Sequence, residues 1–399
     1  MDASQIVRRF PLVARPRPAC PPLAERVREI GGLARNAERD GRLAPAAAAF
    51  NKAALLASDC NLPELARTLC WRHSELYLRT QPLGAQIARY GLEPLVNLAR
   101  LLIRSGDGEA AYILLDSMFQ AVKTRSDTVI DGRTVSFQHI TGSDDDHREV
   151  HRWLWAVLLA DGARALASAG RWTDAFAQLQ RHKGIGKRML DGRQVAVIAR
   201  VMEDGVDEAA TLLDETAPGE PWENAVTACL TVMSRRQAAL PVDRDLDAMM
   251  DCYQQLDRTA ELALFHTRLG LSVIDVADGV DQSVAHRVAS DLIHQTATSG
   301  DGYAARDVLA HAGCSTRLTG RQTHQLGQAV EACALGQGGI PAELRADVMA
   351  ALDTSEGVLR RTLVAAQQAP ALLGQEGGRP CWSGTDPDDA GGQQTTVFR

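Results

Sequence analysis

The chain has 399 residues, a formal net charge of −7 and 45 % hydrophobic residues, of which few are aromatic. This length allows two or three ordinary domains or one long repeat array. The acidic balance, with an isoelectric point near 5.8, argues against a surface that binds nucleic acid over the whole molecule, so a nucleic-acid partner is not expected.

The first 21 residues predict an extended N-terminal arm, because prolines at positions 11, 16, 18 and 21 do not continue a helix. The segment lacks the continuous apolar core of a secretory signal peptide, so we expect a cytoplasmic protein. The longest strongly apolar stretch, Trp153–Ala160, is too short to span a bilayer, and no membrane partner is expected.

Residues 22–123 predict the first helical repeats. Leu23, Val27 and Ile30 recur at helical spacing, and alanine-rich runs such as Ala46–Ala49 favour helices that pack closely. Glycine turns interrupt these patterns at positions 41, 106, 170, 205 and 300, at intervals of 65, 64, 35 and 95 residues. A unit of about 33 residues, the length of one helix–turn–helix repeat, fits these intervals. The pattern therefore predicts an all-α fold, an α-solenoid of antiparallel helix pairs.

Residues 124–146 form a predicted insertion in the repeats. Asp131-Gly132 separates the β-branched runs Thr128–Ile130 and Thr134–Phe137, which is a strong signal for a β-hairpin over residues 128–138. Ser143 and the three following aspartates are suited to the start of a new helix. Insertions in repeat proteins often lie on the binding face, so the hairpin is a candidate for specificity.

Residues 147–370 predict the C-terminal helical repeats, and one unit within them is well marked. Bulky and small residues alternate in the order Trp153, Gly162, Ala165, Leu166, Gly170, Ala175, Phe176 and Leu179. Residues 153–180 resemble a tetratricopeptide repeat. The resemblance implies a TPR-like stack of helix pairs that binds a peptide or protein in its concave face.

Further helices are expected beyond this unit. They are predicted near residues 221–236, 243–269, 282–298, 303–312, 319–335, 341–352 and 355–368. Residues 371–399 are predicted to form a disordered tail, because polar residues, glycine and proline dominate and no apolar period continues.

The loop after the repeat unit is the sharpest candidate ligand site. Residues 181–188 place two glycines among cationic and titratable side chains, and a second Asp-Gly-Arg tripeptide at 191–193 adds a further arginine. We predict that phosphate, carboxylate or an acidic peptide binds there. The alternative interpretation is an ordinary solvated loop. The candidate ligand-binding residues are His182, Lys183, Lys187, Arg188 and Arg193.

Two other groups carry reactive side chains. His147 and His151 lie one helical turn apart, but no third ligand accompanies them, and an exposed first helical turn is the favoured interpretation. His73 and Tyr77 could transfer a proton, yet His73 lies on an apolar helical face, which favours a hydrogen-bonded core histidine. Asp-Gly at 131–132 and 191–192 is explained by turn chemistry.

The eight cysteines argue against a metal site. They lie at positions 20, 60, 70, 229, 252, 314, 333 and 381 and never form a Cys-x-x-Cys pair. A structural zinc site usually has such close ligands, so no metal and no cofactor is expected. We interpret the cysteines as small core residues in a reducing compartment, without a disulfide framework.

These patterns lead to two functional hypotheses. The first is a cytoplasmic helical-repeat scaffold or adaptor that binds a peptide or protein, such as an acidic segment. The alternative is an all-helical enzyme or accessory subunit that acts on a ribosomally made precursor peptide, for instance as a thioether-forming cyclase. That reaction needs a base, to which His73, Tyr77, His147, His151 and Lys187 could contribute, but no catalytic motif is present. A DNA-binding regulator is disfavoured, because the arm is too short for a helix-turn-helix.

Overall fold

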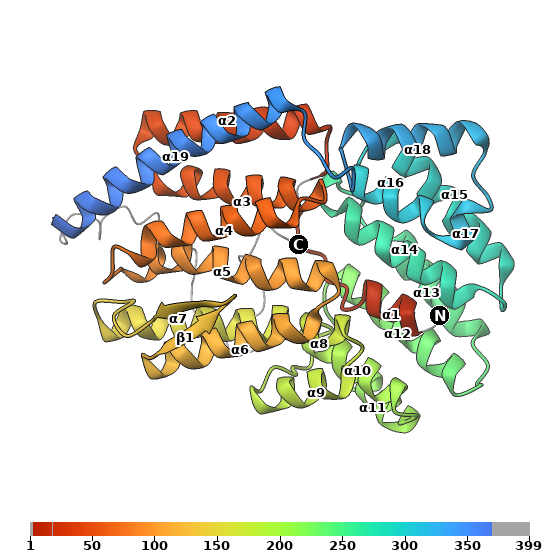
Figure 1. Ribbon diagram of the computed structural model, residues 1–399. Helices are drawn as coiled ribbons and strands as arrows, with labels where there is room; N and C mark the ends of the chain where they lie inside the picture. Colours follow the sequence, from red (N-terminus) through yellow and green to blue (C-terminus); the bar gives the residue numbers. More distant parts are fainter. Residues whose placement is uncertain (1–2, 18, 369–399) are drawn as a thin grey trace. The chain divides into compact units, whose positions relative to one another are not determined.

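The computed structural model describes residues 3–17 and 19–368 (Figure 1). The chain forms two compact units. Unit 1 comprises Met1–Pro22 and Gly162–Leu335, and unit 2 comprises Leu23–Asp161 and Gly336–Arg399. Helices that follow one another in sequence pack together in both units, which confirms the predicted all-α fold of helix pairs. Across the described ranges no helix combines the length and the apolar character needed to cross a membrane. The predicted disordered tail, 371–399, lies outside the described residues.

Unit 2 stacks its helices in sequence order. Each helix from α2 to α5 contacts the next one, and α7 packs on α5 and α6. Figure 1 shows α3, α4 and α5 as successive layers of this stack. The bounds are α2 Leu23–Asp40, α3 Leu43–Asp59, α4 Pro63–Leu78, α5 Ala85–Ser105, α6 Gly108–Thr124 and α7 Asp144–Val157, after which a π-helical segment covers Leu158–Gly162.

The predicted hairpin is confirmed. Strands β1 (Asp127–Ile130) and β2 (Arg133–Ser136) pair antiparallel, with Ile130 opposite Arg133. Asp131 and Gly132 both have positive φ values, of 53° and 76°, as a two-residue turn that matches the strand twist requires. The Asp-Gly signal therefore reflects local backbone geometry, and the Asp131 carboxylate also accepts hydrogen bonds from Arg67 and Trp71 of α4.

One long helix replaces the two that the sequence predicts at the C-terminal end. Helix α19 (Ala342–Gln368) packs on α2, α3 and α4. Arg72 of α4 holds it through ion pairs of 2.6 Å with both Asp353 and Glu356. Arg72 therefore joins α4 to α19.

Unit 1 also packs its helices mainly in sequence order. Each helix from α8 to α12 contacts the next, α14 packs on α12, α15 and α16, and α18 packs on α15 and α16. The helix predicted over 243–269 is two helices, α13 and α14, separated by a non-helical segment and the short 3-10 helix η2. The bounds are α1 Ala3–Arg9, α8 Ala163–Ser168, α9 Trp172–Arg181, α10 Asp191–Met202, α11 Val206–Asp214, α12 Pro221–Gln237, α13 Asp243–Gln254, the 3-10 helix η2 Ala260–Leu262, α14 Ala263–Ala277, α15 Gln282–Ser299, α16 Gly302–Leu309, α17 Ala312–Ser315 and α18 Gly320–Ala332.

Most of the cysteines that the structure describes are buried core residues, as predicted, and all seven are free thiols. Burial raises the pKa of Cys60 to about 11 and the pKa of both Cys229 and Cys314 to about 12. These thiols are therefore protonated near neutral pH and are poor nucleophiles.

Candidate functional site

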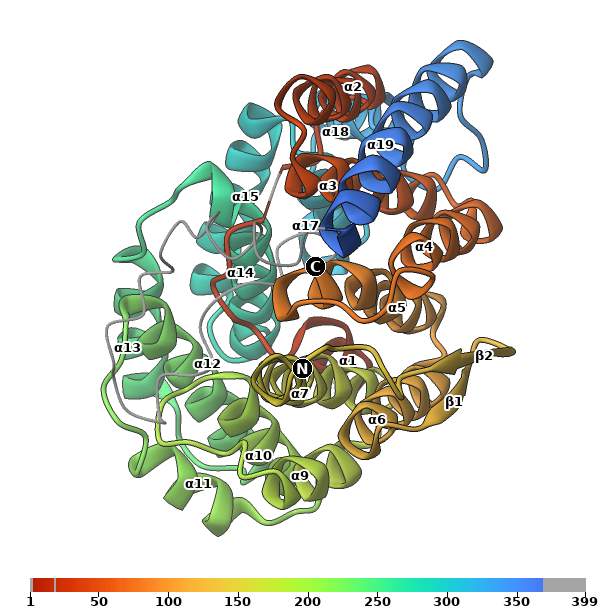
Figure 2. The same cartoon turned by 90° about the vertical axis from the view of Figure 1, so that its left-hand side faces the viewer.

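The N-terminal arm, residues 3–22, is built into unit 1. Helix α1 packs on α8 and α14, and Figure 2 shows the red segment that follows it running beside α14. This corrects the prediction of an extended arm over residues 1–21, since the segment before Pro11 has no proline to prevent a helix. Ile6, Phe10, Leu12 and Cys20 are each at most 3 % exposed. The arm is thus anchored by buried apolar side chains, as a bound peptide is.

Gln194 of α10 binds the backbone of Leu12 through both ends of its amide. Its Oε1 accepts a hydrogen bond of 2.7 Å from the Leu12 N–H, and its Nε2 donates one of 2.6 Å to the Leu12 carbonyl. Nε2 also donates to the Met189 carbonyl at 3.1 Å, which fixes the orientation of the amide. Gln194 is fully buried. Because both bonds go to the main chain, this contact recognises an extended peptide independently of its side chain at that position.

A second backbone contact lies at Cys20. The carboxylate of Asp301 accepts a hydrogen bond of 2.8 Å from the Cys20 N–H, and the Gly302 N–H donates one of 3.0 Å to the Cys20 carbonyl. Asp301 also accepts from the Ala304 N–H and so caps α16. A Cβ atom at Gly302 would lie 2.6 Å from the Cys333 sulfur, so only glycine permits this close packing. The turn that binds Cys20 is thereby fixed before the arm arrives.

Carboxylates of unit 1 hold the arginines of the arm. Arg9 pairs with Asp275, and Arg15 pairs with Asp191 at 2.5 Å. His311 donates or accepts at 3.0 Å on the other oxygen of Asp275. Burial acts to raise the pKa of Asp275, but the hydrogen bond to His311 and the charge of Arg9 outweigh it, so this pKa lies below its ordinary value. Asp275 is therefore ionised near neutral pH and binds a cationic side chain.

Arg17 completes these contacts. Its N–H donates to the Glu261 carbonyl at 2.9 Å, and its guanidinium lies 4.4 Å from the centre of the Tyr303 ring. We call the residues of unit 1 that hold the arm the arm site. They are Asp191, Gln194, Glu261, Asp275, Asp301, Gly302 and Tyr303.

Sequence analysis missed most of the arm site. Gln194 is a polar residue that directly precedes the apolar run Val195–Ile198, and all five are buried. A buried amide needs hydrogen-bond partners, which was an available signal that some backbone reaches it. Asp301 lies in one of the glycine turns that the sequence marked, but its bond to Cys20 has no local signature.

In the basic loop that was predicted as a ligand site, two arginines bind other groups of the protein. Arg188 pairs with Glu223, whose side chain is 1 % exposed. Arg193 donates to the carbonyls of Leu212 and Gly186 and to the hydroxyl of Thr216. Burial lowers the pKa of Arg193.

The other three candidates of that loop lie nearer solvent. His182 caps the end of α9 and is half-buried, while Lys183 and Lys187 are exposed. Binding of an acidic segment at this loop therefore stays a prediction, with the two lysines as the exposed cations.

The two Asp-Gly-Arg tripeptides have different structures. Asp131-Gly132 forms the hairpin turn, but Asp191, Gly192 and Arg193 form the first turn of α10. Turn chemistry does not explain the second copy, which corrects the sequence interpretation. A Cβ atom at Gly192 would lie 2.1 Å from the Gly184 carbonyl oxygen, so the loop packs where only glycine fits.

His73 is a core residue, as predicted, but neither ring nitrogen has a hydrogen-bond partner among residues 3–17 and 19–368. Its ring stacks on Phe50 at a centroid distance of 4.8 Å, and the edge of Tyr77 lies 5.5 Å away. Burial lowers the pKa of His73 to about 3. The hydrogen bonds expected of this histidine are absent because aromatic rings, rather than polar groups, surround it.

His147 and His151 are half-buried instead of lying on an exposed helical turn. His151 stacks on Phe119 at 4.8 Å, which covers one face of its ring. Burial is the main cause that lowers the pKa of both histidines. Within the described residues, no three histidine, cysteine, aspartate or glutamate side chains are placed to hold a metal ion.

Comparison with known proteins gives little further information. No protein-family model matches the chain, and no curated protein matches it. Among solved structures, the chain is similar to a "Circular tandem repeat protein with novel repeat topology and enhanced subunit contact surfaces", with 17 % identity, a TM-score of 0.19, and coverage of 86 % of this chain and 78 % of that one. No tetratricopeptide family is identified, so the helical-repeat architecture is established from the helices themselves.

Proposed function

We propose that the protein is a helical-repeat scaffold whose unit 1 binds an extended, basic peptide segment at the arm site. The observation that carries this proposal is the reciprocal pair of hydrogen bonds between Gln194 and the backbone of Leu12. In this view the N-terminal arm is an internal ligand that occupies the arm site until a partner segment displaces it.

Three kinds of contact define the chemistry of the partner. Gln194 and Asp301 bind backbone groups and so favour any extended chain. Asp191 and Asp275 favour arginine or lysine six residues apart, as Arg9 and Arg15 are. Apolar side chains at the positions of Phe10 and Leu12 would supply buried area, which is the main source of affinity. The expected partner is thus basic, in contrast to the acidic segment that the loop at 182–193 suggested.

The arm has an advantage over any free peptide, because it is part of the same chain. The arm is joined to the rest of unit 1 through Leu23–Asp161 of unit 2, and competition by a segment of the same chain does not depend on protein concentration. A partner therefore has to bind more tightly than the arm or meet a state in which the arm is released. We place this activity in a cytoplasmic setting, where free thiols such as Cys20 and Cys333 are maintained.

Competition by a labelled peptide tests the proposal. The probe is a fluorescent synthetic peptide with the sequence of residues 3–22, titrated into wild-type protein and into the double variant Arg9→Ala, Arg15→Ala. We expect the double variant to bind the probe at least about tenfold more tightly, because its own arm competes less well. The matched control is Arg8→Ala, since Arg8 is exposed and its hydrogen bonds within the described part of the chain go to Ser4.

Further probes separate the outcomes. Adding Gln194→Leu to the double variant should abolish binding, and a probe with glutamate in place of both arginines should not bind. Circular dichroism verifies that each variant remains helical. If wild type and the double variant bind the probe equally well, the arm does not compete for the site. If the double variant is folded but does not bind the probe, peptide binding at this site is refuted.

A further inference from the structure

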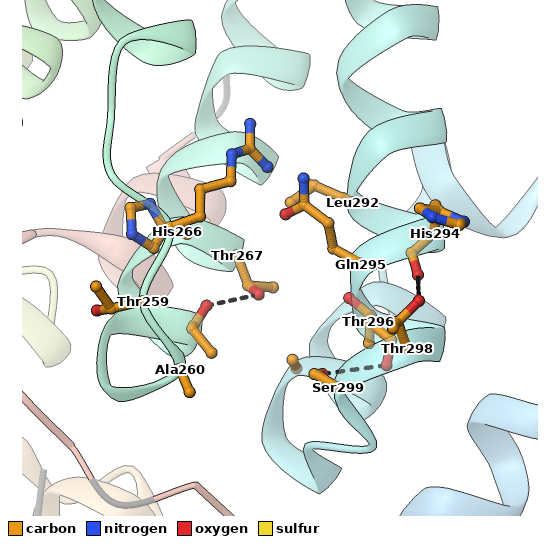
Figure 3. Close-up of a pocket in the computed structure, with 13 residues that line it drawn as sticks. Thr259, Ala260, His266, Thr267, Leu292, His294, Gln295, Thr296, Thr298 and Ser299 are labelled. Atoms are coloured by element: carbon orange, nitrogen blue, oxygen red, sulfur yellow. Dashed lines mark hydrogen bonds between the residues drawn. The ribbon is translucent and has the colours of Figure 1, made fainter.

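A second site in unit 1 lies between the start of α14 and the end of α15. It is a cavity of about 340 Å³. Figure 3 shows its labelled residues in two walls, one from residues 259–267 and one from residues 292–299. The size lies at the lower end of the range for small-molecule sites. No residue of the arm site contributes to its lining.

His266 is the unusual group in this cavity. The residue is 5 % exposed, and among the described residues neither ring nitrogen has a hydrogen bond of ordinary geometry, although the Asp257 backbone lies near enough to raise its pKa against the effect of burial. Leaving a buried polar group unpaired costs on the order of 1–3 kcal/mol, so such groups in folded proteins generally have a function or a missing partner. Phe265 contacts the ring edge-on at 5.5 Å and offers no hydrogen bond. A ligand in the cavity would complete the hydrogen bonding of this ring.

One positively charged side chain lines the cavity. Arg258 is the one side chain of fixed charge in its lining, and no aspartate or glutamate takes part. The guanidinium lies 5.1 Å from the centre of the Tyr253 ring, and no ion pair neutralises it among the residues that the structure describes. A guanidinium can bind a carboxylate with two parallel hydrogen bonds, and the contacts of Arg258 with Tyr253 hold this one at the cavity.

The two helix ends that line the cavity add partial charges of opposite sign. Helix α14 begins at Ala263, and α15 ends at Ser299, and both ends contribute to the lining. A helix carries partial positive charge at its first turn and partial negative charge at its last turn. An anionic group is thus favoured beside Arg258 and Ala263, and a cationic group beside Thr296 and Ser299.

We propose that this cavity binds a small zwitterion, a free α-amino acid, with its carboxylate at Arg258 and its ammonium group at the end of α15. His266 and Gln295 would then bond polar atoms of the ligand, while Leu292 and Ala304 would contact its apolar atoms. Phosphate fits less well, because a dianion would face the negative end of α15 with one arginine to balance it. This site does not depend on peptide binding at the arm site.

Thermal unfolding in the presence of each of the twenty free L-amino acids tests the proposal. We expect at least one of them to raise the Tm of the wild-type protein by about 2–4 °C at saturating concentration. Its amide, which lacks the carboxylate, and its N-acetyl derivative, which lacks the ammonium group, should each bind at least about tenfold more weakly. Inorganic phosphate serves as the oxyanion comparison.

Variants then assign the binding to this cavity. Arg258→Gln should weaken binding of that amino acid by about tenfold or more. Arg244→Gln, an exposed arginine of α13, is the matched control and should bind as wild type does. His266→Phe should abolish binding yet raise the Tm of the protein without amino acid, because it removes two buried nitrogens that lack hydrogen bonds of ordinary geometry and keeps a ring.

Each contrary result overturns the proposal. No Tm shift with any amino acid would refute the site, and a shift with phosphate alone would reassign the cavity to an oxyanion. Equal losses in Arg258→Gln and Arg244→Gln would place the binding elsewhere. A lower Tm for His266→Phe without amino acid would show that this histidine supports the fold rather than a ligand.

Discussion

Gln194 and Leu12 lie 182 residues apart in sequence and exchange two hydrogen bonds, of 2.7 and 2.6 Å. Two residues in adjacent antiparallel strands exchange hydrogen bonds in the same way, and here the side-chain amide of Gln194 takes the place of one backbone. The arm is therefore held at Leu12 by its main chain.

Replacing Gln194 by leucine should destabilise unit 1 and release the arm. The substitution removes both bonds while it keeps most of the side-chain volume, and it leaves the N–H and the carbonyl of Leu12 unpaired in a buried place. We expect a loss of about 2–4 kcal/mol in the free energy of unfolding, measured in urea.

Gln180→Leu provides the comparison, because Gln180 is an exposed glutamine of α9. Hydrogen exchange of the peptide that covers residues 10–17 should become faster in Gln194→Leu and should not change in Gln180→Leu. Slow exchange in both variants would mean that the arm does not depend on the amide.

His73 should make the stability of unit 2 depend on pH between about 3 and 6.5. The unfolded chain binds a proton near pH 6.5, whereas the folded chain does so near pH 3, so the unfolded state carries more protons in this window. Stability therefore falls as pH falls, by about 1.4 kcal/mol per pH unit for this one group.

His73→Phe should remove this contribution, because phenylalanine preserves the stack on Phe50 and has no nitrogen to protonate. Urea unfolding at pH 7 and pH 5 measures the difference, and exposed His324→Phe is the control that should retain the wild-type slope. A steep slope that persists in His73→Phe would assign the pH dependence to other groups.

Arg188 and Lys187 are neighbours in sequence, but we expect their replacement by alanine to have different effects on stability. Arg188 pairs with Glu223, which is 1 % exposed, whereas Lys187 is exposed and its backbone carbonyl accepts from Ala217. Arg188→Ala leaves a buried carboxylate without its cation, and we expect it to destabilise the protein by about 2–4 kcal/mol, since Arg188 itself is partly solvated. Lys187→Ala should change stability by no more than about 0.5 kcal/mol. Equal stability of the two variants in urea would refute the structural role of Arg188.

Local signals in the sequence predicted much of the fold. The hairpin followed from Asp131-Gly132, because a turn of this kind needs residues that tolerate positive φ. Helices such as α12 and α15 followed from apolar periodicity and were found close to their expected bounds. These features depend on residues within one or two turns of each other, and such residues are visible in a sequence.

Contacts between distant segments were not predictable in this way. The arm was expected to be extended, but Asp191 and Gln194 of α10, Asp275 of α14 and Asp301 at the start of α16 hold it. Arg188 and Arg193 looked like ligand-binding cations because nothing local showed Glu223 or the Leu212 carbonyl beside them. The sequence shows which side chains in a loop are cationic. The groups that they bind depend on tertiary packing, which the sequence does not show locally.

Gly192 and Gly186 provide a matched pair for testing how α10 positions the arm site. A Cβ atom at Gly192 would lie 2.1 Å from the Gly184 carbonyl oxygen, a backbone atom that cannot rotate away, whereas a Cβ atom at Gly186 would meet no atom within 4 Å. Gly192→Ala must therefore push the loop off α10, and we expect a loss of about 3 kcal/mol in the free energy of unfolding. Gly186→Ala should be neutral or stabilising by up to about 1 kcal/mol.

The loop displacement in Gly192→Ala should also reach the arm. It would break the 2.9 Å bond from Arg193 to the Gly186 carbonyl and shift Asp191, the partner of Arg15. Hydrogen exchange should then become faster both in residues 184–187 and in residues 10–17. Faster exchange in the loop alone would mean that the arm is held independently of the first turn of α10, because Gln194 lies one turn further along the helix and its bonds to Leu12 would then suffice.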